Sequence, residues 1–254
     1  MSKNATFIKI LEKVQSIKSK KGDFMGSKAA QRAVDALILY NKEIETPQEL
    51  KAIKNVGAST VAKYKEFMKT GTLKFIENFK NDPINLFTNV YGIGPKKAAQ
   101  LVNDDQVTTI SELREYQEHL LNDVQKKGLK YYEDILKRIP RLEIEHYRTK
   151  MSKINIPGLH FEIVGSYRRG AENSGDIDVI ITSEVDNRNV FDCFIGSLIK
   201  QGIIIELLSK GRKKSLTVGK LRGHPARRLD FMFTTKEEYP FAVLYFTGSK
   251  TFNT

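Results

Sequence analysis

The sequence predicts a multidomain α+β protein, in which an all-helical N-terminal half precedes a half built on a mixed or antiparallel sheet with flanking helices. Two patterns carry this expectation. Apolar residues recur every three or four positions through residues 1–80, which is typical of amphipathic helices. From about residue 160 apolar and polar residues alternate, as they do along half-buried strands. The chain of 254 residues is long enough for two or three small domains.

The first helices follow from apolar spacing and from capping residues. Residues 7–17 and 29–40 carry apolar side chains at helical spacing, and the glycine-containing segment 22–27 between them predicts a break. The run Thr-Pro-Gln-Glu at residues 46–49 fits a helix start, with threonine at the N-cap, proline at the first helical position and glutamate at the third.

Two segments of the helical half resemble each other, namely residues 53–63 and residues 90–100. Each has an apolar residue in a tight turn, then a glycine, then the start of a helix. Such a turn directs backbone N–H groups outward, where they form a seat for a phosphate. A pair of them in a basic region indicates helix-hairpin-helix elements, which grip the DNA backbone without reading sequence. Two ordinary helical corners are the alternative.

Further along, residues 105–150 are expected to be helical and charged, with a break at Pro140. The C-terminal half is then expected to contain strands at residues 160–164, at 178–181, at 203–208 (buried) and at 229–233, and a helix at 190–201.

Two aspartates, Asp176 and Asp178, are the most informative residues of the predicted sheet. Side chains on a strand alternate between faces, so both carboxylates point the same way and lie less than about 7 Å apart. Carboxylates that close repel each other unless a cation lies between them. A third acidic residue, Asp230, faces away from the apolar side of its own strand. It is costly to bury unless Arg227 or Arg228 pairs with it or it faces a metal.

The composition limits the class of partner. The net charge is +12, and residues 1–90 hold 16 Lys and Arg against 9 Asp and Glu. This basic balance favours a polyanion, either nucleic acid or an anionic membrane, although a surface kept soluble by lysines gives the same balance. No apolar run reaches the length of a membrane span, and the N-terminus lacks the apolar core of a signal peptide. The single cysteine, Cys193, excludes an internal disulfide framework, suits a reducing compartment and is expected to be a buried core thiol.

Several motifs together resemble the family X DNA polymerases, and the resemblance extends from about residue 5 to residue 254. The motifs are Gly-Leu-Lys-Tyr-Tyr at 128–132, Lys-Arg-Ile-Pro-Arg at 137–141, Gly-Ser-Tyr-Arg-Arg-Gly-Ala-Glu at 165–172, Ser-Gly-Asp-Ile-Asp-Val at 174–179, Arg-Arg-Leu-Asp at 227–230, and Val-Leu-Tyr-Phe-Thr-Gly-Ser at 243–249.

The resemblance implies a DNA-directed DNA polymerase that fills short gaps in base excision repair by two-metal nucleotidyl transfer. Asp176 and Asp178 would bridge two Mg²⁺ ions, for which Mn²⁺ can substitute, and Asp230 would complete the catalytic metal site and accept the proton of the primer 3′-hydroxyl. The residues that match nucleotide-binding positions are Arg138, Ser166, Arg169, Gly175, Tyr245, Phe246, Gly248 and Asn253. Arg228 would position Asp230 and a primer phosphate.

For the helical half, the resemblance implies a 5′-deoxyribose-phosphate lyase with Lys63 as its Schiff-base nucleophile, whose pKa would be lowered by Lys54 and Lys65. A plain phosphate-contacting lysine is the alternative. The sequence departs from the family pattern nearby, at Asn55, Ser59 and Ala62. The backbone carbonyls expected to hold a monovalent cation, Na⁺ or K⁺, belong to Lys51, Ile53 and Val56 in the first hairpin and to Thr88, Val90 and Ile93 in the second. The other residues expected to contact DNA are Gly57, Gly92, Gly94 and Lys96.

Three domains are expected: a helical DNA-binding and lyase domain at 1–80 with the first hairpin, a helical DNA-binding subdomain at 81–142 with the second, and a nucleotidyltransferase palm at 143–254. The family continues beyond Asn253 into a C-terminal subdomain, which is expected to be absent here. Two other functions stay open, a template-independent terminal or RNA-type nucleotidyltransferase and a non-catalytic DNA-binding fragment.

The expected partners are gapped or nicked duplex DNA and a deoxynucleoside triphosphate, with no membrane. The expected protein is a monomer, and a repair ligase is a candidate partner. It is expected in the nucleus if the protein is cellular, and in the host cytoplasm or the virion if it is viral.

Overall fold

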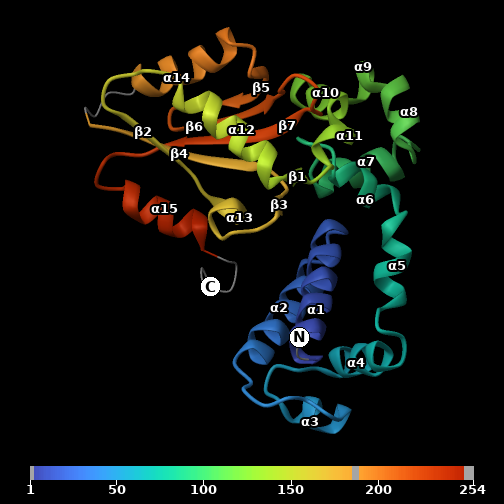
Figure 1. Ribbon diagram of the computed structural model, residues 1–254. Helices are drawn as coiled ribbons and strands as arrows, with labels where there is room; N and C mark the ends of the chain where they lie inside the picture. The colour runs from blue at the N-terminus through green and yellow to red at the C-terminus, as the bar shows by residue number, and fades with distance from the viewer. Residues whose placement is uncertain (1–2, 185–188, 249–254) are drawn as a thin grey trace. The chain divides into compact units, whose positions relative to one another are not determined.

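The computed structural model describes residues 3–184 and 189–248. The chain divides into two compact units, Met1–Asn122 and Asp123–Thr254. The two units differ in secondary structure as the sequence predicts, because the first is helical and the second contains the sheets (Figure 1).

The first unit is built from short helices. They are α1 (Lys3–Lys20), α2 (Phe24–Ile38), α3 (Pro47–Ala52), α4 (Ala58–Thr70), α5 (Lys74–Lys80), α6 (Pro83–Thr88), α7 (Pro95–Asn103), α8 (Ile110–Glu115) and α9 (Gln117–Leu120). Apolar side chains of α1 and α2 make the centre of its core together with residues of α3, α4 and α5. The phenol of Tyr64, buried in this core, donates to the carbonyl of Ile44 at 2.7 Å, which fixes α4 to the segment before α3.

The capping residues act largely as the sequence predicts. Thr46 caps α3 by accepting a hydrogen bond from the backbone N–H of Glu49, and Pro47 occupies the first helical turn. The expected break before α2 is shorter than predicted, because Asp23 caps this helix by accepting from Gly26 N–H, and α2 therefore begins at Phe24.

The second unit contains two sheets and the remaining helices. Its helices are α10 (Asp123–Lys130), α11 (Tyr132–Ile135), α12 (Arg141–Ser152), α13 (Gly165–Arg168), α14 (Asn189–Lys200) and α15 (Tyr239–Thr247). Its strands are β1 (Ile139–Pro140), β2 (Leu159–Ile163), β3 (Asn173–Ser174), β4 (Ile177–Ser183), β5 (Ile204–Lys210), β6 (Lys214–Gly219) and β7 (Arg227–Phe233).

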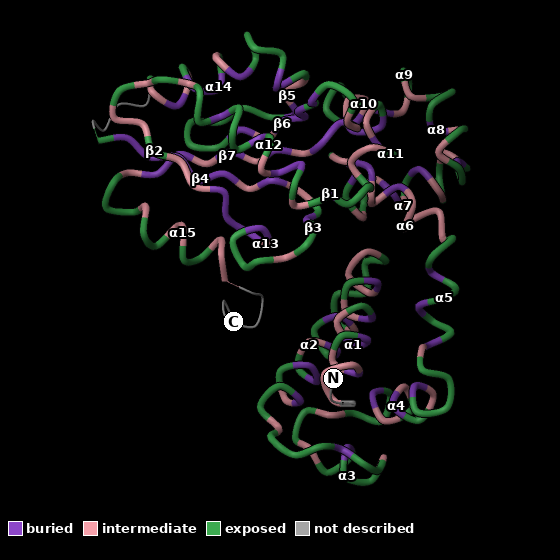
Figure 2. The backbone as a smooth tube through the Cα atoms, viewed as in Figure 1, coloured by how far each residue is buried: buried purple, intermediate pink, exposed green. Residues whose placement is uncertain are grey.

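The larger sheet has the strand order β2-β4-β7-β6-β5, and β1 pairs with β3 in a separate small ladder. Strands β4 and β7 are parallel, whereas the other neighbours in the larger sheet are antiparallel, so the expected mixed sheet is confirmed. The odd-numbered residues from Ile177 to Ile181 and from Leu229 to Phe233 pack with buried residues of α12 and α14 in the core of this unit. Figure 2 shows buried stretches along both strands. Even-numbered residues point to the opposite face, which α15 contacts along β4.

Two expectations for this unit are wrong. Cys193 is exposed, because the buried face of α14 is set by Phe191, Phe194, Ile195 and Leu198 and position 193 lies off that face. Strand β5 is an edge strand in which three of the seven residues are exposed and two are buried, so it is only partly buried, whereas its run of apolar residues predicts a buried strand. No helix within the described residues is long and apolar enough to cross a membrane.

Candidate active site

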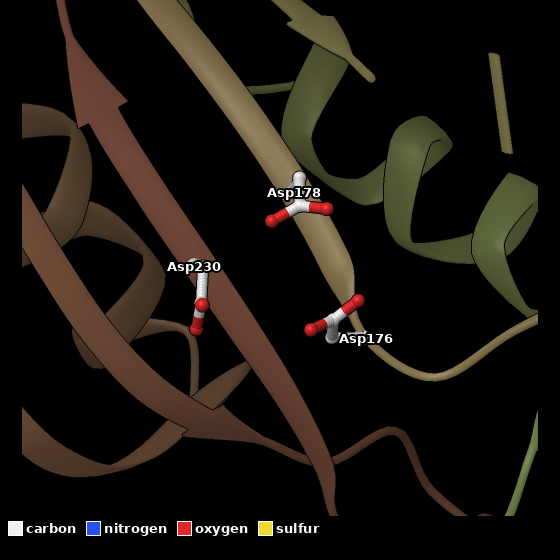
Figure 3. A group of neighbouring side chains, drawn as sticks. All are labelled: Asp176, Asp178 and Asp230. Atoms are coloured by element: carbon white, nitrogen blue, oxygen red, sulfur yellow. The ribbon is translucent and has the colours of Figure 1, made fainter. Parts of the chain in front are cut away.

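The three aspartates singled out in the sequence come together at one place on the sheet. Asp178 lies directly opposite Asp230 in the parallel register of β4 and β7, and Asp176 precedes β4 by one residue (Figure 3). One carboxylate oxygen from each lies within 4.8 Å of the others. Within residues 3–184 and 189–248, no other group of three or more His, Cys, Asp or Glu is arranged to hold a metal ion.

The electrostatics of this cluster fit a cation site. Burial, and then the neighbouring charge of Asp230, raises the pKa of Asp178 to about 6. Burial also raises the pKa of Asp230, although Arg228 and Lys214 act in the opposite direction. In the described part of the chain, Oδ1 of Asp230 is buried without a hydrogen-bond donor. Carboxylate oxygens clustered this closely are the hard donor set that Mg²⁺ or Mn²⁺ takes.

Arg228 is the cation that contacts the cluster directly. Its guanidinium donates to Asp176, and its Nε lies 3.5 Å from Oδ1 of Asp230. The sequence left the partner of Asp230 open between Arg227 and Arg228. Arg227 faces the other side of β7, where it is buried against Glu143, so of these two arginines Arg228 is the one beside Asp230.

Gly165 lies against the cluster in a backbone conformation that favours glycine. Its φ is +63°, and a Cβ at this position would lie 2.6 Å from Oδ2 of Asp178. The Gly-Ser turn therefore brings backbone close to a carboxylate in a way that no side chain permits.

The residues expected to hold a triphosphate line the adjoining loops of the same unit. Ser166 lies in α13, and its hydroxyl donates to Oγ of Ser174 at 2.8 Å. Arg138 donates to the side chain and the carbonyl of Asn173 at 2.7 and 2.8 Å, and its Nη1 would lie 3.2 Å from a Cβ at Gly175.

Arg169 follows α13 and donates to the carbonyls of Thr247 and Gly248 at 3.0 and 3.5 Å. In this arrangement the side chain contacts the end of α15, which also carries the residues expected to contact the sugar. Arg169 is exposed, so it also has solvent-accessible donors.

The residues expected near the sugar lie at the end of α15. Tyr245 is 61% exposed, and Gly248 ends the helix. Phe246 lines a small cavity of about 10 Å³ together with Asp178, Asp230 and Lys214. Asn253 lies outside the described residues.

Lys214 was missed by the sequence reasoning. It lies on β6 two residues before Leu216, which pairs with Asp230, so the register of β6 places it on the face of the aspartates. The sequence of β6 carries no signal for this face, because polar Ser215 and Thr217 are buried while apolar Leu216 shares the face of Lys214, so only the pairing of β6 with β7 places Lys214 near the aspartates.

In the first unit, the two predicted hairpins share a backbone geometry. Gly57 and Gly94 both occupy the N-cap of the second helix, with φ of −88° and −85° and ψ of 168° and 173°. In the first hairpin the N–H of Val56 donates to the carbonyl of Ile53 at 3.1 Å. In the second, the N–H of Ile93 donates to the carbonyl of Val90 at 3.1 Å.

The remaining hairpin residues take matching places. Lys51 belongs to α3 and Thr88 to α6, Ile93 corresponds to Val56, and Lys96 is exposed in the first turn of α7. Asn55 has φ of +70° where the second hairpin has Gly92 at +85°, so an asparagine adopts the left-handed conformation that the turn requires.

Lys63 lines a cavity of about 350 Å³ in the first unit, whose lining also includes Lys18, Arg32 and Asn55. Its Nζ lies 2.5 Å from Oγ of Ser59 and 3.3 Å from the carbonyl of the same residue.

Burial, and then the positive charge of Lys18, lowers the pKa of Lys63. The sequence named Lys54 and Lys65 as the cations responsible, and this is wrong because the contributing lysine comes from α1.

The mixed sheet and its carboxylate cluster define a nucleotidyltransferase-type palm, which follows the helical domains in the sequence. Three family models match consecutive parts of the chain: a helix-hairpin-helix domain at residues 2–73, a fingers domain of DNA polymerase lambda at 85–136 and a DNA polymerase beta palm at 138–236.

Curated relatives agree with these models. The chain is 31% identical to DNA polymerase lambda of Rattus norvegicus over 97% of its length and 27% identical to DNA polymerase lambda of Arabidopsis thaliana over 98%. It is 28% identical over 70% of its length to a type-X family protein, pol4, of Schizosaccharomyces pombe. The chain belongs to the X family of DNA polymerases. It spans 44% and 50% of the two lambda relatives, about half of their length.

Proposed function

We propose that the protein is a DNA-directed DNA polymerase that fills short gaps in base excision repair. The observation that carries this proposal is the cluster of Asp176, Asp178 and Asp230 on neighbouring strands, beside a glycine turn and arginines suited to phosphate. Gapped or nicked duplex DNA and a deoxynucleoside triphosphate are the proposed substrates, and the net charge of +12 supports a polyanionic partner.

The proposed roles follow from the positions of the residues. Two divalent ions held by the three aspartates would lower the pKa of the primer 3′-hydroxyl and neutralise charge on the triphosphate. Asp230 would accept the hydroxyl proton, and Arg228 would orient the carboxylate of Asp230. Arg138 and Ser166 would bind phosphate oxygens from the loops beside Gly175.

The sugar and base contacts are proposed at the end of α15 and just beyond it. Tyr245, Phe246 and Gly248 at the end of α15 would contact the sugar and crowd its 2′ position, because Phe246 already lies beside the aspartates. Asn253 is proposed to lie near the incoming base on the strength of the sequence match.

The test is extension of a primer across a one-nucleotide gap by the full chain, with Mg²⁺ and deoxynucleotides. Asp230→Asn should abolish extension, because it removes a ligand and the proton acceptor. Asp192→Asn, which weakens a partly exposed ion pair with Lys210 in the same unit, serves as the matched control. Extension that survives in Asp230→Asn would refute the proposal.

The same assay discriminates the alternative functions. Incorporation of ribonucleotides, or extension of single-stranded primers without a template, would indicate a terminal or RNA-type nucleotidyltransferase. Binding of gapped DNA with no incorporation would indicate a non-catalytic DNA-binding protein. The paired hairpins favour duplex DNA over a single-stranded substrate, because each has a glycine N-cap without a side-chain cap, a helix start suited to a backbone phosphate.

A second activity, a 5′-deoxyribose-phosphate lyase, is favoured by the cavity around Lys63. An amine with a lowered pKa beside Lys18 and Arg32 combines a nucleophile with cations for a sugar phosphate. Borohydride should trap the imine that forms between the Lys63 amine and the sugar aldehyde with loss of water. Lys63→Ala should abolish trapping, whereas Lys65→Ala, on the exposed side of α4, should retain it.

The remaining elements of the proposal rest on the family. The three domains are proposed at residues 1–80, 81–142 and 143–254. Each hairpin is proposed to bind Na⁺ or K⁺ through its backbone carbonyls, and the protein to act as a monomer with a repair ligase as a partner. The proposed compartment is the nucleus for a cellular protein, and the host cytoplasm or virion for a viral one.

A further inference from the structure

A buried ion pair joins α12 to β7 on the core side of the active-site sheet. Nε of Arg227 donates to Oε1 of Glu143 and Nη2 donates to Oε2, both at 2.8 Å. The side chains of Arg227 and Glu143 are only 5% and 3% exposed. Nδ1 of His224 lies 3.4 Å from the same carboxylate. Replacing such a pair with apolar residues is often neutral or stabilising, so a contribution to stability does not account for it.

The guanidinium of Arg227 has a third contact, which points to a different role. Its Nη1 donates to the backbone carbonyls of Lys137 and Arg138 at 3.0 and 3.4 Å. Those carbonyls belong to the segment between α11 and β1. The side chain of Arg138 leaves this segment toward Asn173, to which it donates two hydrogen bonds. Arg227 therefore fixes the backbone from which a proposed triphosphate ligand projects, and Glu143 fixes Arg227.

The same turn of α12 is also bonded to α13, the helix that carries Ser166. Nη1 of Arg141 donates to the carbonyl of Tyr167 at 2.7 Å, and its guanidinium lies 4.2 Å from the centre of the Tyr167 ring. Tyr167 is the neighbour of Ser166 in α13. The start of α12 is thus connected both to the segment of Arg138 and to the turn of Ser166.

We propose that Glu143 is a positioning residue, which acts through Arg227 to hold Arg138 in place for the triphosphate of the incoming nucleotide. The proposal rests on the proposed polymerase function and adds a residue that touches neither the metals nor the substrate. A planar guanidinium suits this role because one group binds a carboxylate through two nitrogens and two carbonyls through the third.

The test separates positioning from folding. In Glu143→Leu/Arg227→Met the charged pair is replaced by apolar side chains of similar size, which preserves packing but removes the donor to the two carbonyls. Arg227→Lys keeps the positive charge but lacks the planar guanidinium that binds the carboxylate and the carbonyls together. Asp192→Asn is the matched control. Each full-length protein is titrated with a deoxynucleoside triphosphate in Ca²⁺, to prevent turnover, and separately with Mn²⁺ alone. Hydrogen exchange is followed in residues 135–142 and in β7.

The expected result for the double variant is a Kd for the nucleotide that is raised about 10-fold or more, with the Mn²⁺ affinity within about twofold of wild type. Exchange should become about 10-fold faster in residues 135–142 while it stays unchanged in β7. Arg227→Lys should likewise raise the Kd for the nucleotide while it leaves the Mn²⁺ affinity nearly unchanged. Equal nucleotide affinity in the wild type and the double variant would overturn the positioning role alone. Failure of the wild type to bind nucleotide would overturn the proposed function and the positioning role with it.

Discussion

Replacement of Asp178 by asparagine should stabilise the metal-free protein while it removes a metal ligand. The carboxyl lies on the face of the sheet where Asp178 of β4 is directly opposite Asp230 of β7, and burial together with this neighbour raises its pKa to about 6. An amide of the same shape carries no charge, so Asp178→Asn removes the penalty without leaving a cavity.

The magnitude follows from the pKa difference between the folded and unfolded chains. The pKa rises from 3.8 to about 6 on folding. At about 1.4 kcal/mol per pKa unit, the ionised carboxylate costs about 3 kcal/mol of folding free energy above pH 7. Because the folded state holds the proton more tightly, the penalty is nearly absent below about pH 4, reaches about 1.5 kcal/mol at pH 5 and is complete above about pH 7.

The assay is hydrogen exchange of the slowest amides in β4 and β7, measured at pH 5 and at pH 8 in the presence of EDTA. This readout reports the opening of the second unit and does not require the two units to unfold together. The increase in the free energy of unfolding from wild type to Asp178→Asn should be about twice as large at pH 8 as at pH 5. A variant that is equally or less stable than wild type at pH 8 would refute the reasoning. With saturating Mg²⁺ only the wild type should gain stability.

Three further predictions concern backbone strain and lysine chemistry. Gly165→Ala should destabilise the second unit by about 2 kcal/mol, because φ is +63° and the new Cβ would lie 2.6 Å from Asp178 Oδ2; a change in thermal unfolding worth less than about 0.5 kcal/mol would contradict this. Asn55→Val should destabilise the first unit by about 1–2 kcal/mol in urea unfolding, whereas Asn55→Gly should change it by less than about 1 kcal/mol, because only the β-branched residue resists a φ of +70°. Borohydride trapping by Lys63 should reach half its maximum at a pH below that of an ordinary lysine, and Lys18→Ala should move this midpoint upward; an unmoved midpoint would remove Lys18 as a cause.

The alternation of strand residues was enough to predict the faces of the sheet. The two-residue period of a strand was enough to place the side chain of Asp178 on the face opposite its two buried neighbours. It was also enough to place Asp230 on the face opposite Leu229 and Phe231. That period also carried an unused signal: Arg228 shares the face of Asp230, whereas Arg227 must point into the core. The structure confirms this division.

Other features depended on pairings that no local pattern contains. The parallel contact between β4 and β7 joins residues 52 positions apart, so the meeting of Asp178 and Asp230 was implied by the family resemblance and not by periodicity. The effect of Lys18 on Lys63 likewise crosses from α1 to α4. Cys193 differs, because the helical spacing of Phe191, Phe194 and Leu198 was visible in the sequence and would have placed the thiol outside the core.

The site therefore combines two opposing demands on the same two strands. The odd positions of β4 and β7 build the core that holds the second unit together, and the even positions place acidic groups where burial raises their pKa. A sheet selected for stability alone would carry a neutral side chain at position 178. A carboxylate that costs about 3 kcal/mol when ionised fits a site at which a bound cation offsets that cost. A divalent cation does so at the pH where the penalty is largest, because it binds the same ionised form that burial disfavours.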